Sequence, residues 1–424
     1  MTTGLTTLPE ELVELVNGYL DIQDLCSLRS ACRELAAKAS GGIFKTTVSK
    51  GRLRLTEDGI KAFESIARPE SLGSHIQELT VLGIAHHSGH SLPRTESSLS
   101  ILQKGFRNLK TASAGGWLRR ITIEVAALVD GELSAPEFPA PILMNRVESL
   151  QKPPKCTHEK PPSLRQVYST AAESFKLVML ALQASQLLVN TLELFTTQTG
   201  CSIPCDALLP ALVDIDQSIL DGVRRLCIRI CHPLPPKHGV GDHEHSHSKE
   251  SDSKEMEAAE FLNAFKCLDS LEIRYFSIGG RRLVTSPSLV AAISKASGWP
   301  TLRSLELHGL AANASALNRL FDAHLATLER VSMVEVGLTE GGTFNHILDA
   351  ITARSKRIRY FHFENQMQRC EVSFDQATDS PQTFADAIAE VREMHNRRFG
   401  SEPDNILIAE HRIQEYGPPV RSID

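Results

Sequence analysis

Residues 268–276 read LDSLEIRYF, and residues 302–310 return to the same pattern as LRSLELHGL. In both stretches apolar residues occupy the first, fourth, sixth and ninth positions, so apolar and polar side chains alternate through the middle. Alternation of this kind is typical of a strand with one buried face. Residues 286–297 and 314–325, which follow the two stretches, have the apolar spacing of helices. The sequence therefore predicts a unit of one strand and one helix.

This unit recurs along most of the chain. Looser copies of the strand pattern begin at Ile76, Leu118, Val223 and Leu328, with a weaker one at Ile358. The last four copies are spaced 34, 26 and 30 residues apart, which resembles the period of leucine-rich repeats, whose units stack to share one core. We therefore predict an α/β fold, in which an irregular leucine-rich-repeat-like strand/helix solenoid follows a helical N-terminus. Because the spacing is uneven and the usual Asn or Cys of the repeat is missing, a non-repetitive α/β domain remains an alternative.

Two stretches of biased composition interrupt the repeats. A proline-rich insertion covers residues 135–162, and residues 233–257 consist almost entirely of Pro, Gly, His, Ser and charged residues. Segments of this kind bury too little apolar surface to fold, so we expect a loop in the first case and disorder in the second. Between the two insertions, residues 164–194 and 205–220 have the apolar spacing of helices, which we expect to pack on the solenoid.

The composition is that of an ordinary globular protein, with 42% apolar and 23% charged residues among 424. A net charge of −6 argues against a chain that binds nucleic acid through its overall charge. The longest nearly charge-free apolar stretch, residues 177–189, is too short to cross a bilayer, and the N-terminus lacks the features of a signal peptide. We therefore expect no nucleic-acid or membrane partner, reduced thiols for the nine cysteines, and a cytoplasmic or nuclear location.

The first forty residues carry a different pattern. Thr7, Pro9 and Glu10 fit a helix start, with a hydroxyl cap, a proline in the first turn and a glutamate at its end. The apolar residues that follow at helical spacing are Leu12, Leu15, Val16, Tyr19 and Leu20, and then Leu25, Leu28 and Cys32 in a second helix. Helices this short cannot bury enough surface to be stable alone. We expect them to dock on the rest of the chain, on a partner, or on both.

Residues 8–40, LPEELVELVNGYLDIQDLCSLRSACRELAAKAS, resemble the F-box, and the order and spacing of that pattern hold throughout. The matching positions are Leu8, Pro9, Glu11, Leu12, Val13, Leu15, Val16, Tyr19, Leu20, Asp24, Leu25, Leu28, Arg29, Cys32, Arg33 and Leu35. Leu35 stands where many members carry Trp, although Leu is common there in fungal members. Residues 43–48 also resemble the segment that trails fungal F-boxes.

The resemblance implies a docking module at the N-terminus. F-boxes insert an apolar helical face into the Skp adaptor, which links them to a cullin-based ubiquitin ligase. The implied protein is a non-catalytic substrate-recognition subunit of an SCF-type complex, with the Skp adaptor and the cullin scaffold as partners. The residues carried over as adaptor contacts are Leu8, Pro9, Leu12, Leu15, Val16, Leu20, Leu25, Leu28 and Cys32. The implied divisions are a three-helix F-box at 1–42, a linker at 43–72, an irregular repeat domain at 73–400 and a tail at 401–424.

In such a receptor the repeat domain holds a protein target. Residues that alternate with the buried ones face outward from the row of strands, and this face is our candidate for target binding. The candidate residues are Glu272, Arg274, Glu306, His308, Arg330, Tyr360 and His362. A solvated sheet surface with no binding role is the alternative.

A different function also remains open. The N-terminal helices could merely cap the domain that follows them. The chain would then be a non-catalytic leucine-rich-repeat-like scaffold or interaction protein, with or without adaptor binding but without a ligase role. Protection of residues 12–28 from hydrogen exchange in the isolated chain would favour this alternative.

The sequence offers no catalytic constellation. Residues 243–247, HEHSH, satisfy H-E-x-x-H by letter, but their polar neighbours provide no apolar face for the helix that a metalloprotease requires. Cys201, Cys205, Cys227 and Cys231 resemble a zinc site only superficially, since the last two lie in a strand pattern, where Cys is usually a small buried apolar residue. We therefore predict no metal site, no cofactor and no enzymatic activity.

Overall fold

The structure is a computed structural model that describes most of the chain in separate segments. The described residues are 5–20, 22–39, 42–68, 72–86, 96–129, 132–134, 162–196, 201–231, 247–276, 288–296, 298–339, 344, 347, 357–364, 366–368 and 413–415. Within these segments, no helix combines the length and the apolar character needed to cross a membrane.

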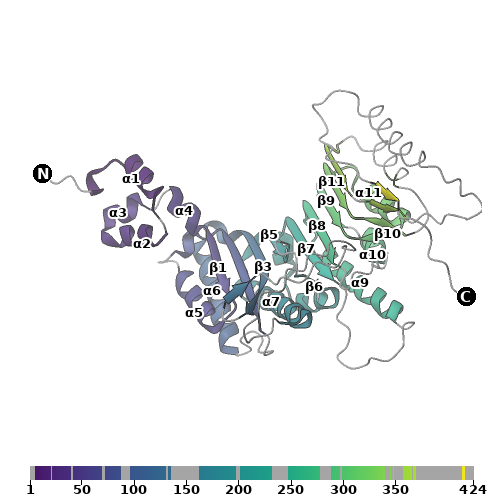
Figure 1. The fold of residues 1–424 in the computed structure, drawn as a ribbon, viewed down its shortest axis with the longest axis horizontal. Coiled ribbons are helices and arrows are strands. Elements are labelled where there is room, and N and C mark those ends of the chain that lie inside the picture. Colours follow the sequence, from purple (N-terminus) through teal and green to yellow (C-terminus); the bar gives the residue numbers. More distant parts are fainter. Residues whose placement is uncertain are drawn as a thin grey trace, which may run out of the picture.

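A long parallel sheet runs through the molecule, and its strands lie side by side in chain order (Figure 1). In order they are β1 (Lys50–Arg54), β2 (Glu78–Ala85), β3 (Trp117–Val129), β5 (Leu188–Leu194), β7 (Arg225–Cys231), β8 (Ser270–Phe276), β9 (Ser304–His308), β11 (Arg330–Val334) and β13 (Tyr360–Glu364). β4 (Glu132–Ser134) pairs antiparallel with β3, and β6 (Ile203–Pro204) pairs with β7. A smaller parallel sheet contains β10 (Ala311–Ala312), β12 (Gly337–Leu338), β14 (Gln366–Gln368) and β15 (Ile413–Glu415).

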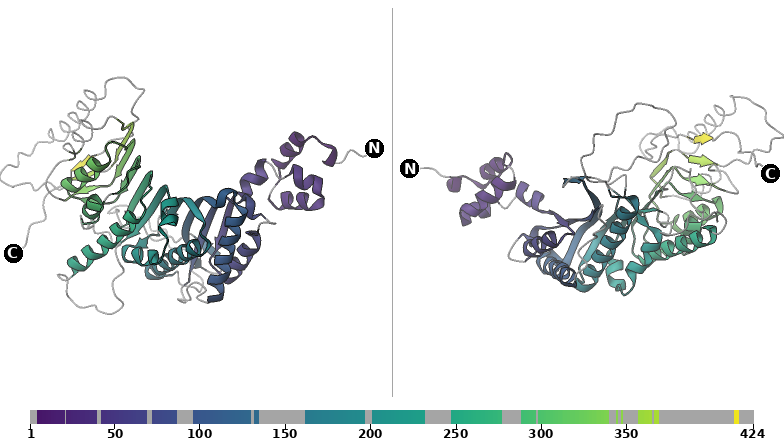
Figure 2. Two further views of the ribbon diagram at one scale, coloured as in Figure 1. Left: turned by 180° about the vertical axis from the view of Figure 1, so that it is seen from behind. Right: turned by 60° about the horizontal axis from the view of Figure 1, so that its bottom comes forward.

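Helices connect the strands and lie on one face of the long sheet (Figure 2). They are α5 (Glu57–Ile66), α6 (Glu96–Ala112), α7 (Leu164–Ser185), α8 (Gln217–Gly222), α9 (His247–Ala264), α10 (Ser288–Ala296) and α11 (Ala314–His324). Neighbouring helices pack in a row, α5 on α6, α6 on α7, α9 on α10 and α10 on α11. A helix between successive strands provides the crossover that parallel pairing requires.

The strands bury one face against these helices. In β8, Leu271 and Ile273 are fully buried, whereas Ser270 and Arg274 on the opposite face are partly exposed. One continuous hydrophobic cluster extends from β1 to β13, so neighbouring units share a core instead of each enclosing its own. The predicted α/β fold is confirmed.

The predicted linker at residues 43–72 is wrong. These residues contain most of α4 (Gly42–Val48), all of β1, and α5, and the sheet therefore begins well before residue 73. The reason lies in three apolar side chains, Leu53, Ile60 and Phe63, which are buried in the shared core. Leu53 alternates with charged residues in the strand, and Ile60 and Phe63 lie on one face of α5, so this stretch already has the strand-and-helix composition of a unit.

Residues 164–194, predicted as one helical segment, form a helix followed by a strand. α7 ends at Ser185, and Gln186 takes a left-handed backbone conformation with φ of 55°. A left-handed residue directly after the last helical turn is a common way to end a helix. The chain then enters β5 at Leu188.

The prediction of disorder is wrong for residues 247–257, because α9 (His247–Ala264) begins at His247. Glu255 in this helix is fully buried, and its carboxylate accepts hydrogen bonds from the Ser288 hydroxyl and from the backbone N–H of Leu289. A carboxylate at the first turn of α10 satisfies backbone donors that the helix itself leaves unpaired. The parts of the two insertions and of the tail that lie outside the described residues are 135–161, 233–246, 401–412 and 416–424.

Short helices precede the sheet and lie beyond its β1 end (Figure 1). They are the 3-10 helix η1 (Leu5–Thr7) and the α-helices α1 (Glu10–Asn17), α2 (Ile22–Ala31), α3 (Arg33–Lys38) and α4. Within the predicted F-box at 1–42, the described residues form the 3-10 helix η1 and the three α-helices α1, α2 and α3. A fourth helix, α4, begins at residue 42, falls almost entirely in the predicted linker and leads into β1.

A buried histidine predicts a pH-dependent stability. His324 at the end of α11 is 3% exposed and stacks on Trp299, with 5.8 Å between ring centroids. Burial lowers the pKa of His324, although a hydrogen bond to the Trp299 backbone partly opposes this effect. The unfolded chain therefore takes up this proton near pH 6.5, and the folded chain takes it up only at a lower pH. Stability consequently falls as the pH drops from about 6.5 toward the pKa of the folded state, by up to about 1.4 kcal/mol per pH unit.

The measurement is urea unfolding at pH 7.5 and pH 5 of the natural chain and of His324→Phe. Both proteins share every other titrating group, so the difference between their pH dependences isolates His324. We expect a smaller loss of stability on acidification in the variant. Equal losses in the two proteins would contradict the assignment.

Candidate protein-docking sites

The N-terminal helices expose an apolar surface. Leu12 and Leu15 lie on α1 and are 47% and 62% exposed, and Tyr19 just after it is 85% exposed. Leu5 in η1 is 43% exposed. We call these four residues the N-terminal ridge. Leu12 and Leu15 are three residues apart on α1 and are therefore neighbours on its surface. Adjacent large apolar side chains that remain exposed are typical of a docking surface.

The same helices have a small interior of their own. Val13, Leu25 and Phe44 are buried, and the Arg29 guanidinium lies 3.6 Å from the centre of the Phe44 ring. Phe44 also meets the His75 ring edge-on, at 6.3 Å between centroids, which connects α4 to the residues that lead into β2. The residues of the N-terminal ridge are therefore exposed on a folded support.

The predicted adaptor contacts differ in how much of each side chain is exposed. Pro9, Leu12, Leu15 and Cys32 are exposed, and Leu8, Val16, Leu20 and Leu28 are partly buried. The prediction for Leu25 is wrong, because this side chain is 1% exposed within the helical interior. The sulfur of Cys32 accepts a hydrogen bond from the backbone N–H of Leu35 and so caps the start of α3.

The second candidate surface is the face of the sheet opposite the helices. The parallel register sets Glu272 of β8 beside Glu306 of β9, and Arg274 beside His308. All seven predicted target-binding residues lie on this face, namely Glu272, Arg274, Glu306, His308, Arg330, Tyr360 and His362. Glu272 is only 7% exposed, so it can offer little contact area to a target.

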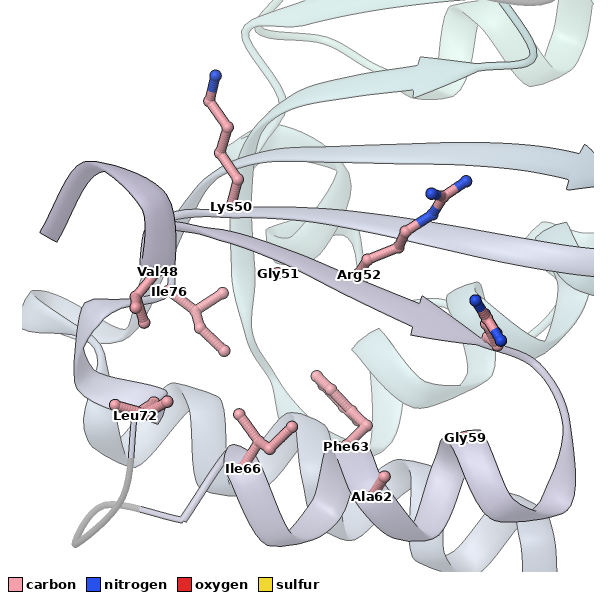
Figure 3. Close-up of a pocket in the computed structure, with 11 residues that line it drawn as sticks. Val48, Lys50, Gly51, Arg52, Gly59, Ala62, Phe63, Ile66, Leu72 and Ile76 are labelled. Carbon is pink, nitrogen blue, oxygen red and sulfur yellow. The ribbon is translucent and has the colours of Figure 1, made fainter. Parts of the chain in front are cut away.

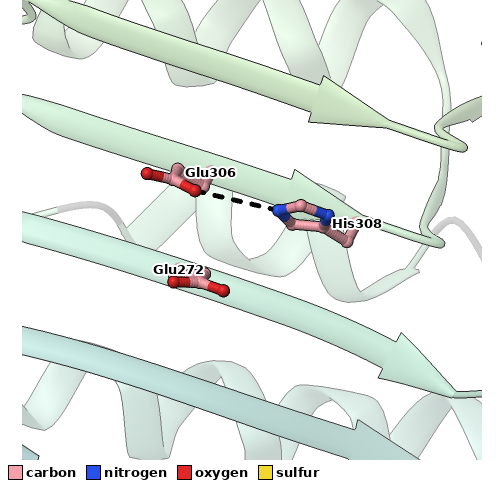
Figure 4. Close-up of side chains that lie close together, drawn as sticks. All are labelled: Glu272, Glu306 and His308. Atoms are coloured by element: carbon pink, nitrogen blue, oxygen red, sulfur yellow. Dashed lines mark ion pairs between the residues drawn. The ribbon is translucent and has the colours of Figure 1, made fainter. Parts of the chain in front are cut away.

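Neighbouring side chains on this face partly neutralise one another. The Arg274 guanidinium forms an ion pair with Glu272 inside the same strand. His308 Nε2 lies 3.9 Å from Glu306 Oε2 (Figure 4), and the imidazole lowers the pKa of the Glu306 carboxyl. Arg330 lies over the Tyr360 ring, 4.7 Å from its centre. The face therefore presents a mixed array of charges next to an aromatic ring.

Three of these side chains have the composition of a metal site. The donor atoms of Glu272, Glu306 and His308 lie within 4.8 Å of one another. Arg274, however, already pairs with Glu272, and its positive charge opposes a cation at the same place. We interpret the group as part of the charged surface and assign no metal to it.

The four cysteines considered as a superficial zinc site lie in the interior. Cys201, Cys205, Cys227 and Cys231 are each at most 2% exposed. Burial raises the pKa of the Cys227 and Cys231 thiols to about 12, so they stay protonated and unreactive at neutral pH. Of the His-rich motif at 243–247, the first four residues lie outside the described part of the chain.

One feature was not singled out from the sequence. A cleft of about 520 Å³ lies between β1 and α5 (Figure 3), and its lining includes Val48, Arg52, Ala62, Phe63, Ile66 and Leu72. The alternation of Lys50, Arg52 and Arg54 with smaller or apolar residues is the sequence signal that could have revealed the strand at its rim.

Comparisons with known proteins assign no function to either surface. No protein-family model matches the chain, and no curated protein matches its sequence. The two surfaces are therefore interpreted from their own geometry and chemistry.

Proposed function

We propose that this chain is the substrate-recognition subunit of an SCF-type cullin ubiquitin ligase, acting in the cytoplasm or nucleus. The observation that carries the proposal is the exposure of Leu12 and Leu15 on α1, at positions that match the F-box pattern. The N-terminal helices would serve as the F-box and dock on the Skp adaptor. The strand-and-helix units would serve as an irregular leucine-rich-repeat-like domain that holds a protein target.

The energetics of the N-terminal ridge support docking. Burial of apolar surface contributes about 25 cal/mol per Å², so side chains as large as Leu15 and Tyr19 are costly to leave in water. Their helical spacing suits insertion into an apolar groove, where such residues act as anchors and the polar residues between them stay at the rim. Because the ridge has a folded support, docking would require little reorganisation of the chain.

The proposed mechanism involves no bond chemistry by this protein. A target bound to the open face of the sheet would be held near the ubiquitin-charged enzyme on the cullin. Holding two reactants together raises their effective concentration by orders of magnitude. The separation between the N-terminal ridge at one end and the charged face of β8–β13 further along would allow adaptor and target to bind together (Figure 1).

Reconstitution tests the proposal directly. The full chain is combined with Skp adaptor, cullin core, ubiquitin-charged enzyme and proteins captured on the chain from an extract. We expect the adaptor to copurify with the chain, and at least one captured protein to be ubiquitinated only when the cullin is present. Adaptor binding without ubiquitin transfer would indicate a scaffold instead, and absence of adaptor binding would contradict the proposal.

Charge reversal on the sheet face tests the target surface. In the variant with Arg274→Glu and Arg330→Glu, we expect capture of the target to fall at least about tenfold, because reversing charges at an interface opposes both encounter and docking. Adaptor capture should not change. Arg319→Glu on α11, at an exposed position on the helical side, is the matched control. If the double variant captured the target as well as the natural chain, the target would have to bind at another surface.

Arg274→Glu leaves the buried Glu272 without its ion-pair partner, which could unfold the sheet locally. Arg330→Glu alone avoids this effect, since Arg330 is exposed and lies over Tyr360. We expect the single variant to lower target capture in the same direction, by a smaller factor.

A further inference from the structure

The first strand of the long sheet has one edge without a partner strand among the described residues. β1 stands at the end of the strand order and pairs with β2 on one side. The N–H of Leu55 donates to the carbonyl of Leu82 in β2, and in a parallel ladder alternate residues point their backbone groups to the same side. The residues whose N–H and C=O groups consequently point to the free edge are Lys50, Arg52 and Arg54.

An apolar cleft lies next to this edge. It separates β1 from α5, and Figure 3 shows Ile66, Phe63 and Ala62 facing it from the helix. Lys50, Arg52 and Arg54 belong to its rim on the β1 side, and Figure 3 shows the charged ends of Lys50 and Arg52 directed away from α5. Ile66 is 44% exposed, which is unusual for an isoleucine beside a core. The cleft would therefore gain apolar contact if an additional strand lay along β1 and directed side chains into it.

The other face of β1 is strongly basic. Lys50, Arg52 and Arg54 are all exposed and lie at alternate positions, on the face opposite the buried Leu53. In the part of the chain that the structure describes, no ion pair involves any of the three. The nearest acidic neighbour in register, Glu78 of β2, pairs with Arg119 and Arg120 instead. The positive charge along the edge is thus uncompensated.

We infer that the free edge of β1 accepts an extended segment of a partner protein in which acidic residues alternate with apolar ones. Successive residues of the added strand would point to opposite faces, acidic ones toward Lys50, Arg52 and Arg54 and apolar ones into the cleft. Main-chain hydrogen bonds to β1 supply binding that does not depend on side chains. This inference goes beyond the proposed function, because neither the N-terminal ridge nor the charged face of β8–β13 uses this edge.

Basic residues on an edge strand have another known role, which is to keep other strands away. The two roles lead to opposite results with an acidic peptide. A protected edge binds no strand of either charge, whereas a docking edge binds the acidic strand and rejects the basic one. The apolar cleft favours docking, since protection alone does not require it.

The test uses the full chain and two capped, fluorescent seven-residue peptides, one alternating glutamate with valine and the other alternating lysine with valine. Fluorescence polarisation at low ionic strength should show saturable binding of the glutamate peptide, and binding of the lysine peptide at least about tenfold weaker, because cross-strand charge pairs reverse sign. Absence of saturable binding by the glutamate peptide, or equal binding of both peptides, would overturn the inference.

Variants of the chain locate the site. Arg52→Glu should weaken binding of the glutamate peptide about tenfold, whereas Arg107→Glu, at an exposed position on α6, should leave it unchanged. Equal effects of the two variants would show that the peptide binds elsewhere. Adaptor capture by Arg52→Glu should equal that of the natural chain, so failure of this inference is distinguishable from failure of the proposed function.

N-methylated peptides test the strand pairing itself. One peptide carries N-methyl groups on every glutamate and the other on every valine. Because alternate residues of a paired strand point their N–H groups toward the neighbouring strand, one of the two peptides should lose binding and the other should keep it. Loss in both, or in neither, would overturn strand addition as the mode of binding.

Discussion

The double variant Leu12→Asp and Leu15→Asp is expected to lose capture of the Skp adaptor by at least about a thousandfold. Both side chains are exposed on α1, so a charge at either position meets water in the free chain and costs little there. In an apolar groove each replaced anchor loses about 2 kcal/mol or more, and each new carboxylate must also give up its hydration. The measurement is binding of purified adaptor to the immobilised chain.

Two comparisons make this result specific. Glu14→Ala changes an exposed residue of the same helix and should leave adaptor capture unaltered. Leu8→Ala with Pro9→Ala should also abolish copurification, since both positions match the F-box pattern and neither is buried. Thermal unfolding of every variant should stay close to that of the natural chain. Adaptor binding by a folded Leu12→Asp and Leu15→Asp chain would contradict the assignment of the N-terminal helices.

The strands that could be predicted are those in which polar and apolar residues alternate. LDSLEIRYF at residues 268–276 contains β8, and LRSLELHGL at 302–310 contains β9, each near its predicted position. A strand with one buried and one open face has apolar residues at every second position, so it can be recognised without knowing which strands pair with it. The α/β fold follows from such strands alternating with helical stretches.

The elements that were missed lack this simple signal. β5 follows α7 closely, and its apolar residues continue the apolar spacing of the helix, so nothing in the pattern marks the change. The boundary depends on Gln186, a residue whose left-handed backbone is not evident from its type. In α9 the first turns are polar, and the buried Glu255 is held by partners on α10 that lie more than thirty residues away in the sequence.

The sequence also predicted only part of the candidate sites. Alternation correctly set Arg274 and His308 on one face, but the lateral contact between strands depends on register, which the sequence alone does not give. The resemblance to the F-box implied that Leu12 and Leu25 would both be adaptor contacts. The structure separates them, because α2 packs with its neighbours through Leu25 whereas α1 leaves Leu12 outside.

Phe261→Ala is expected to lower the free energy of unfolding by about 3–5 kcal/mol. Phe261 of α9 is fully buried between two other rings, 5.8 Å from Phe175 of α7 and 5.2 Å from Phe265 by their centroids. Truncation leaves a cavity and removes both edge-to-face contacts. Because α7 and α9 belong to different units of the shared core, we expect the loss to loosen their packing on each other. Urea unfolding followed by circular dichroism measures the effect.

Met256→Ala on the same helix is the control, since Met256 is 53% exposed and its truncation leaves no cavity. We expect it to change stability by less than about 0.5 kcal/mol. Phe261→Leu should lie between the two variants, because leucine fills part of the space but offers no ring to Phe175. If Phe261→Ala were as stable as Met256→Ala, the contact of Phe261 with Phe175 would not stabilise the packing of α9 on α7. In that case the packing between strands, and not the contact between helices, would be what holds neighbouring units of the core together.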